Sequence, residues 1–142
     1  MLSTIKYYLI LIVILVSSFA EKLNAQVSVI ANNTIIVNAI DDNTLKNLFT
    51  LRSNELGSQK VKLFFINSEN ETVKKLLHSI GKSFHEIKKE WLRAKLTGNG
   101  NPPEMVPSDK EMLEKIFTTP NAIGFIDSKL VPSHMKVLLK ID

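Results

Sequence analysis

The sequence contains no cysteine among its 142 residues. This absence excludes disulfide bonds, metal sites built on thiolates, cysteine nucleophiles and a lipid attached to an N-terminal cysteine. The chain also has no large excess of one charge, because 18 lysines and arginines against 14 acidic residues leave a formal net charge of +4. The basic residues are scattered, so the charge pattern favours neither nucleic-acid binding nor attachment to a membrane surface.

The rest of the composition is that of a folded domain. Hydrophobic residues make up 44% of the chain and charged residues 23%, which is typical of globular and not of disordered proteins. The length favours one domain, and the sequence has no internal repeat.

Residues 1–25 are organised like a secretory signal peptide. Lys6 supplies a short positive region, and an apolar run from Tyr7 to Val16 follows it. The run is shorter than the roughly 20 residues that cross a membrane and has the length of a signal-peptide core. An uncleaved N-terminal anchor is the alternative interpretation of this segment.

Small residues offer two cleavage sites, one after Ala20 and one after Ala25. The second is preferred because Val27 then opens the first predicted strand. Cleavage there leaves a single domain over residues 26–142. With its signal peptide removed and no lipid attached, this domain is expected to be periplasmic or secreted and not embedded in a membrane.

Hydrophobic periodicity predicts an α/β fold. Strands are expected over residues 27–31, 61–66, 122–126 and 136–140, with 35–37 resuming the first strand. One helix is expected after Asp41 or Asp42, and three more follow the middle strand. Residues 52–58 and 97–107 are expected to be loops. This order predicts a small mixed sheet packed with helices.

Three of the predicted helix starts share the pattern Ser-x-x-Glu, at residues 68–71, 83–86 and 108–111. The serine oxygen accepts a backbone N–H three residues on, while the glutamate reaches back to the N–H of the serine. Apolar residues then recur at helical spacing, and Gly81 and Gly98 are placed to end the first two helices. The pattern predicts Ser-capped helices at all three positions.

The residue types do not predict catalysis, a cofactor or a metal site. His85 lacks the second histidine four positions on that a zinc-protease helix requires, and His78 lies on a different predicted helix. The serines are not in a nucleophile-elbow context. Most carboxylates lie at helix starts, where the helix dipole accounts for them. We therefore expect no enzymatic activity.

The turn after the strand at 61–66 is the first candidate ligand site. Ligands of open α/β sheets bind outside the carboxyl ends of strands, and the start of a helix favours anions. The hydroxyl and amide groups of the turn come from Asn67, Ser68, Asn70 and Thr72. Glu69 and Glu71 would repel an anion, and an ordinary capped helix is the alternative interpretation.

The segment from Trp91 to Pro103 is the second candidate. Its tryptophan and the cations Arg93 and Lys95 could line a cleft and contact an anion. In the alternative interpretation Trp91 packs in the core and both cations are solvated.

Three segments carry a resemblance to a known family. Residues 45–49 read Leu-Lys-Asn-Leu-Phe, residues 96–103 read Leu-Thr-Gly-Asn-Gly-Asn-Pro-Pro, and residues 119–126 read Thr-Pro-Asn-Ala-Ile-Gly-Phe-Ile. Together they resemble the short phosphate ABC transporter substrate-binding-like proteins, whose last segment reads Thr-Pro-Gly-Ala-Ile-Gly-Tyr. The resemblance covers residues 27–130.

The resemblance implies a type II periplasmic-binding-protein fold about one lobe in size, and a non-enzymatic role in solute transport. It implies a small anion or other small solute as ligand, and an ABC transporter permease or another periplasmic protein as partner. Full-length members hold phosphate with an arginine after the strand and a Ser-Gly-Thr at the next helix. Here Asn67 follows the strand and Asn70-Glu71-Thr72 opens the helix, so ordinary phosphate binding is not expected. An interaction module that kept the fold but lost its ligand is the alternative.

Overall fold

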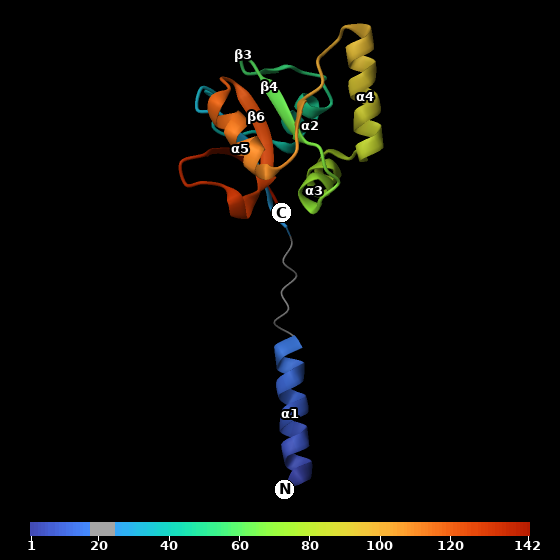
Figure 1. Ribbon diagram of the computed structural model, residues 1–142, viewed down its shortest axis with the longest axis vertical. Coiled ribbons are helices and arrows are strands. Elements are labelled where there is room, and N and C mark those ends of the chain that lie inside the picture. The colour runs from blue at the N-terminus through green and yellow to red at the C-terminus, as the bar shows by residue number, and fades with distance from the viewer. Residues whose placement is uncertain (18–24) are drawn as a thin grey trace.

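The computed structural model describes residues 1–17 and 25–142 (Figure 1). Helix α1, Leu2–Ser17, exposes the side chains of residues 1–13. In the described ranges, no helix is both long enough and apolar enough to cross a membrane. The predicted cleavage site after Ala20 lies outside the described residues, as does the segment before Ala25 at the second site.

A five-stranded mixed sheet in the order β5-β4-β6-β1-β7 forms the centre of the domain. Strand β4 runs parallel to both β5 and β6, while β1 is antiparallel to β6 and β7. The strands are β1 (Val27–Ala31), β4 (Lys62–Ile66), β5 (Glu104–Val106), β6 (Ala122–Asp127) and β7 (Lys136–Ile141). The predicted small mixed sheet is therefore confirmed.

Helices cover both faces of this sheet (Figure 1). Helix α5 (Asp109–Thr118) lies on one face, and α2 (Asp42–Phe49), α3 (Glu71–Ile80) and α4 (Phe84–Thr97) lie on the other. Helix α5 packs closely on the sheet: a Cβ added to Gly124 of β6 would lie only 2.3 Å from Met112 Sδ of α5. A side chain at Gly124 would require the Met112 side chain to move, so the glycine lets α5 pack closely on β6.

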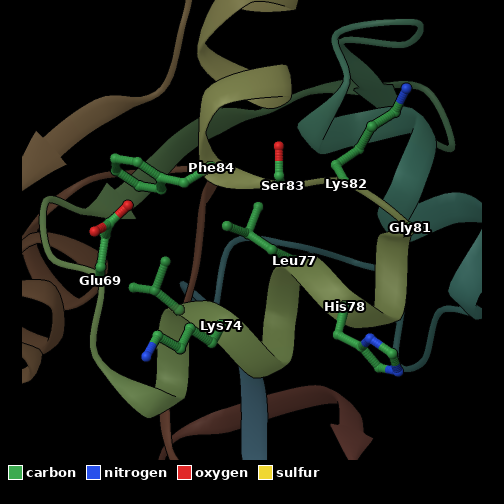
Figure 2. A pocket seen from close by; sticks show the side chains of 9 residues that line it. Glu69, Lys74, Leu77, His78, Gly81, Lys82, Ser83 and Phe84 are labelled. Atoms are coloured by element: carbon green, nitrogen blue, oxygen red, sulfur yellow. The ribbon is translucent and has the colours of Figure 1, made fainter.

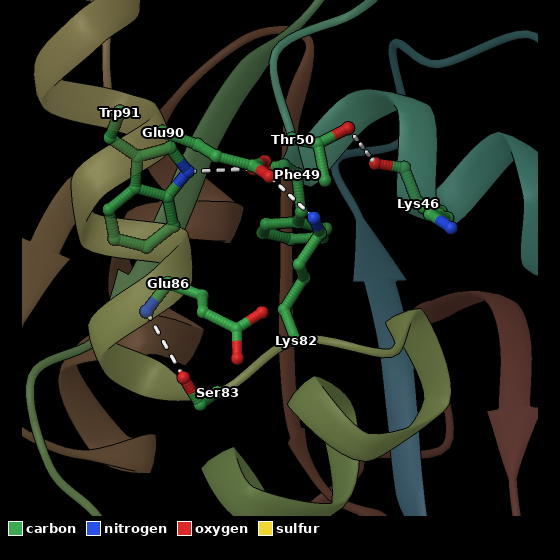
Figure 3. Close-up of polar contacts among 8 residues, drawn as sticks. All are labelled: Lys46, Phe49, Thr50, Lys82, Ser83, Glu86, Glu90 and Trp91. Carbon is green, nitrogen blue, oxygen red and sulfur yellow. Dashed lines mark hydrogen bonds and ion pairs between the residues drawn. The ribbon is translucent and has the colours of Figure 1, made fainter.

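A cluster of aromatic rings joins β4 and β6 to the helices on the second face. The Phe65 ring centroid lies 4.9 Å from those of Trp91 and Phe125, 6.0 Å from Phe49 and 6.1 Å from Phe84. The Trp91 indole N–H also donates to the Phe49 carbonyl oxygen at 2.7 Å (Figure 3). Trp91 is 4% exposed, so the interpretation that places it in the core is confirmed.

Three of the predicted helix caps are confirmed. The side chains of Asp41, Ser83 and Ser108 each accept the backbone N–H of the residue three positions on. Gly81 and Gly98 follow their helices with φ of 72° and 73°, a left-handed conformation that glycine adopts without strain.

The predicted cap at Ser68 is wrong. Asn70 caps α3 instead, because its side-chain oxygen accepts the backbone N–H of Val73 at 2.9 Å. Ser68 is still in the preceding turn, where its N–H donates to the Ile66 carbonyl. Asn and Ser are equally good caps, so the Ser-x-x-Glu pattern could not distinguish the two positions.

Three predictions for the connecting segments need correction. Residues 35–37 form no strand; the Ile36 N–H donates to the Gln59 side chain and the Ile35 carbonyl accepts from the Lys136 side chain. Residues 52–58 are not all loop, because β2 (Glu55–Leu56) pairs with β3 (Gln59–Lys60). Residues 97–107 contain β5, which is too short to show a strand period but extends the sheet beside β4.

Replacing Trp91 by Ala should lower the free energy of unfolding by about 3–5 kcal/mol, because the change opens a cavity beside Phe65. It also leaves the Phe49 carbonyl without its indole donor. Leu92→Ala is the matched control: Leu92 is 56% exposed, and we expect a change of at most about 0.5 kcal/mol. Urea denaturation compares the two variants, and equal stabilities would contradict the packing described for Trp91.

Candidate functional site

The turn after β4 lies outside the carboxyl ends of the parallel strands, as expected of a ligand site in this fold class. Strand β4 ends at Ile66. The backbone N–H of Asn67 donates to the carbonyl of Val106, the last residue of β5, at 2.8 Å. The turn is therefore fixed to the ends of two neighbouring strands.

The four predicted ligand-binding residues lie in this one segment, but they do not all face solvent. Asn67 is exposed and Ser68 is half-buried. The Asn70 side chain is already engaged in capping α3, and Thr72 is only 6% exposed. Two neutral side chains therefore remain for a ligand at the turn.

The charges at this edge are mainly negative. Glu69 and Glu71 are exposed in the turn and at the start of α3, Asp109 opens α5 shortly after β5, and Asp127 is the last residue of β6. Lys74 lies 3.6 Å from Glu71, but both side chains are largely exposed, so this pair offsets little of the charge. An anion approaching the turn would meet carboxylates.

Asp109 shows the effect of this clustering on a single carboxyl group. Partial burial raises its pKa above the ordinary value of 3.8, and the negative charge of Asp127 raises it further. A backbone hydrogen bond from Asp127 opposes both effects, but the buried Oδ1 atom has no hydrogen-bond partner. The ionised form of Asp109 is therefore disfavoured in the folded protein.

A groove of about 500 Å³ lies beside the turn, between α3 and the start of α4 (Figure 2). Leu77 and Phe84 give it apolar surface, and Glu69 points toward Phe84. Lys82 also lines the groove, but it is paired with Glu90 at 2.5 Å (Figure 3). Apolar surface and mixed charges do not suit a small inorganic anion.

Arg93 and Lys95, the alternative anion contacts, are both exposed on α4. Neither lines the cavity of about 610 Å³ beside the loop that follows this helix. Arg93 is two residues after Trp91, and two residues correspond to about half a turn of the helix. The Arg93 side chain therefore lies on the opposite face of α4 from Trp91 and points away from the core.

The loop cavity instead takes its cations from segments that the sequence analysis treated only as connections. Arg52 follows α2, Lys60 ends β3 and Lys62 opens β4. The signal that could have found them is the Gly57-Ser58 pair, which is typical of a two-residue hairpin turn. Such a hairpin folds β3 back along β2, so that Lys60 at the end of β3 returns toward Arg52 in the segment after α2.

The segments that carry the family resemblance have structural roles. Asn121 has φ of 58°, a left-handed conformation, at the position where the family pattern has glycine. Gly98 ends α4, and a Cβ at Gly100 would lie 3.4 Å from the Leu51 Cβ. Asn121 and Gly98 are therefore explained by their left-handed backbone conformation.

No family model and no curated protein matches the chain. Solved structures of phosphate-transport proteins match its fold. A phosphate ABC transporter substrate-binding protein from Clostridium perfringens, solved with bound phosphate, superposes with a TM-score of 0.65 at 12% identity. A phosphate transport receptor from Vibrio cholerae gives 0.63 at 16% identity, and PstS from Borrelia burgdorferi gives 0.58 at 18% identity.

Each match covers 80% of this chain and 45–47% of the other protein. The chain thus spans less than half the length of these neighbours and has the fold of about one lobe of a substrate-binding protein. At these identities the similarity establishes the fold alone.

Replacing Asp109 by Asn should raise the melting temperature at pH 7. The raised pKa means that ionised Asp109 disfavours the folded state, and asparagine removes that charge while keeping an acceptor for Asp127. Below the ordinary value of 3.8 the carboxyl is protonated in both states, so the gain should shrink as the pH falls toward that value. Thermal denaturation at several pH values measures this trend.

Asp41→Asn is the control with the opposite sign, because hydrogen bonds from Thr44 lower the pKa of Asp41. It should lose stability at neutral pH, and the loss should fade in acid. A stability gain from Asp109→Asn that is constant down to strongly acid pH would contradict the electrostatic account.

Proposed function

We propose that the protein is an exported, non-enzymatic solute-binding protein of the phosphate-transport type that binds inorganic phosphate weakly. The observation that carries the proposal is a fold match over 80% of the chain to phosphate-transport proteins, combined with Asn67 where the family has an arginine. A small solute is the expected ligand, and an ABC transporter permease or another periplasmic protein is the expected partner.

The chemistry of the turn supports weak phosphate binding. Asn67 and Ser68 supply neutral hydrogen bonds, each worth about 1 kcal/mol, and a bidentate guanidinium contact is missing from the turn. Phosphate carries about −1.5 to −2 charge at neutral pH and would lie near Glu69 and Glu71. Two like charges ~4 Å apart repel by about 4 kcal/mol at an effective dielectric of about 20, and solvent screening reduces this value.

Isothermal calorimetry should therefore give a phosphate Kd in the millimolar range or weaker, equivalent to at most about 4 kcal/mol of binding energy. The double variant Asn67→Arg, Glu71→Gly should bind phosphate more tightly, because it adds a guanidinium and removes a carboxylate. Glu114→Gln, an exposed acid of α5, is the matched control and should leave the affinity unchanged. Micromolar phosphate binding by the natural protein would contradict the proposal.

An interaction module that kept the fold and lost ligand binding is the second candidate. The acidic turn favours it, because Glu69 and Glu71 are exposed where an anion would bind. A thermal-shift scan separates the two, because a ligand at 100 times its Kd adds about 2.7 kcal/mol of stability. A flat scan across phosphate, sulfate and organic carboxylates would favour the interaction module.

We further propose that residues 1–25 direct export and are removed. The apolar run is too short to cross a membrane, and a small residue, Ala25, precedes the first strand at Val27. N-terminal sequencing of protein from the periplasmic fraction should begin at Gln26, with Glu21 as a minor start. An intact chain beginning at Met1 in the membrane pellet would overturn the cleavage and support an anchor.

A further inference from the structure

The loop cavity lies at the amino ends of the parallel strands, opposite the turn that holds phosphate in the resembling family. Its lining includes Lys62 and Glu104, the first residues of β4 and β5. Its volume of about 610 Å³ falls in the range of about 300–1,000 Å³ that is typical of organic ligands. It is therefore large enough for a molecule well beyond the size of an inorganic ion.

Two cations of the cavity have no acidic partner in the part of the chain that the structure describes. Arg52 and Lys60 line the cavity and form no ion pair within 4 Å among these residues. Glu55 is opposite Lys60 in the β2–β3 ladder, but it does not line the cavity. Both positive charges are thus available to an anion.

The acid in the lining, Glu104, is already neutralised. Lys115 lies 3.1 Å from its Oε1 atom and Lys62 lies 3.2 Å from its Oε2 atom. Hydrogen bonds from Lys115 and then Lys62 lower the pKa of Glu104, so the carboxylate stays ionised and paired. It therefore does not cancel the charges of Arg52 and Lys60.

Neutral hydrogen-bonding groups complete the lining. The loop after α4 contributes Asn99, Gly100 and Asn101, and the segment after Arg52 contributes Ser53 and Asn54. Among the described residues, the backbone N–H groups of Gly100 and Asn101 donate to no acceptor. Amides, a hydroxyl and free N–H groups suit a ligand that carries polar groups besides its charge.

The backbone that carries Arg52 is fixed in position. The N–H groups of Arg52 and Ser53 both donate to the Asn47 carbonyl of α2, at 2.9 and 3.1 Å. Leu51 has φ of 61°, a left-handed conformation that is costly for a residue other than glycine. A Cβ at Gly100 would meet the Leu51 Cβ at 3.4 Å, an ordinary van der Waals distance. Such retained backbone strain is common where a site is preorganised.

We propose that this cavity binds a polar organic anion, with Arg52 and Lys60 contacting its carboxylate or phosphoryl group. The asparagines and Ser53 hydrogen-bond the neutral part of the same molecule. This inference deepens the proposed solute-binding role and rests on it, but it uses a site at the opposite edge of the sheet from Asn67. An Arg fork together with a lysine favours such an anionic group over a neutral sugar.

Calorimetry on the purified protein tests the proposal with two probes, citrate for carboxylates and glucose 6-phosphate for phosphoryl groups. At least one of them should bind, and glucose should not. The double variant Arg52→Gln, Lys60→Gln should weaken this binding by about tenfold or more, because each lost charge-assisted hydrogen bond is worth about that factor. The matched control Arg93→Gln, Lys95→Gln should change the affinity by less than about twofold.

A second measurement needs no variant and so does not depend on folding of the double mutant. Acetylation of lysines in the natural protein, followed by mass spectrometry, should show Lys60 protected by the bound probe and Lys95 unprotected. The absence of binding of either probe up to about 10 mM would overturn the inference. So would binding that leaves Lys60 unprotected, or binding that the double variant does not weaken. These failures would leave the weak phosphate affinity of the Asn67 turn untouched, so the two proposals fail separately.

Discussion

The aromatic cluster around Phe65 anchors strand β4, which lies between β5 and β6 in the sheet. The Phe65 ring on β4 contacts the rings of Trp91 on α4 and Phe125 on β6. These contacts pack the three elements against one another. The Trp91 indole N–H binds the carbonyl of Phe49, the last residue of α2, and Leu51 and Arg52 follow directly. The same cluster therefore positions the turn at one end of β4 and the loop cavity at the other.

The two ends of β4 have opposite electrostatic character. The carboxyl end leads into a turn with Glu69 and Glu71, where a helix start would otherwise favour an anion. The amino end adjoins a cavity in which Arg52 and Lys60 are unpaired among the described residues. The shared fold thus does not fix where an anion binds, because the charged side chains and not the strand order decide it.

The sequence predicted the elements that repeat a clear hydrophobic period, and it predicted that Trp91 lies in the core. It failed at the start of α3, where Ser68 and Asn70 are cap residues of similar preference and Asn70 is the one that caps the helix. It also failed for Arg52 and Lys60. Their meeting at one cavity depends on a short hairpin and on the packing of the α2 end, which have no period in the sequence.

We propose that a polar organic anion binds at the amino end of β4 and not at the turn after its carboxyl end. Backbone amide chemical-shift mapping by NMR, during titration with citrate or glucose 6-phosphate, tests it most directly. The account predicts that the shifts concentrate at residues 52–54, 60–62 and 99–101 and that residues 67–72 stay unchanged. Saturating shifts confined to residues 67–72, with none around Arg52, would contradict it.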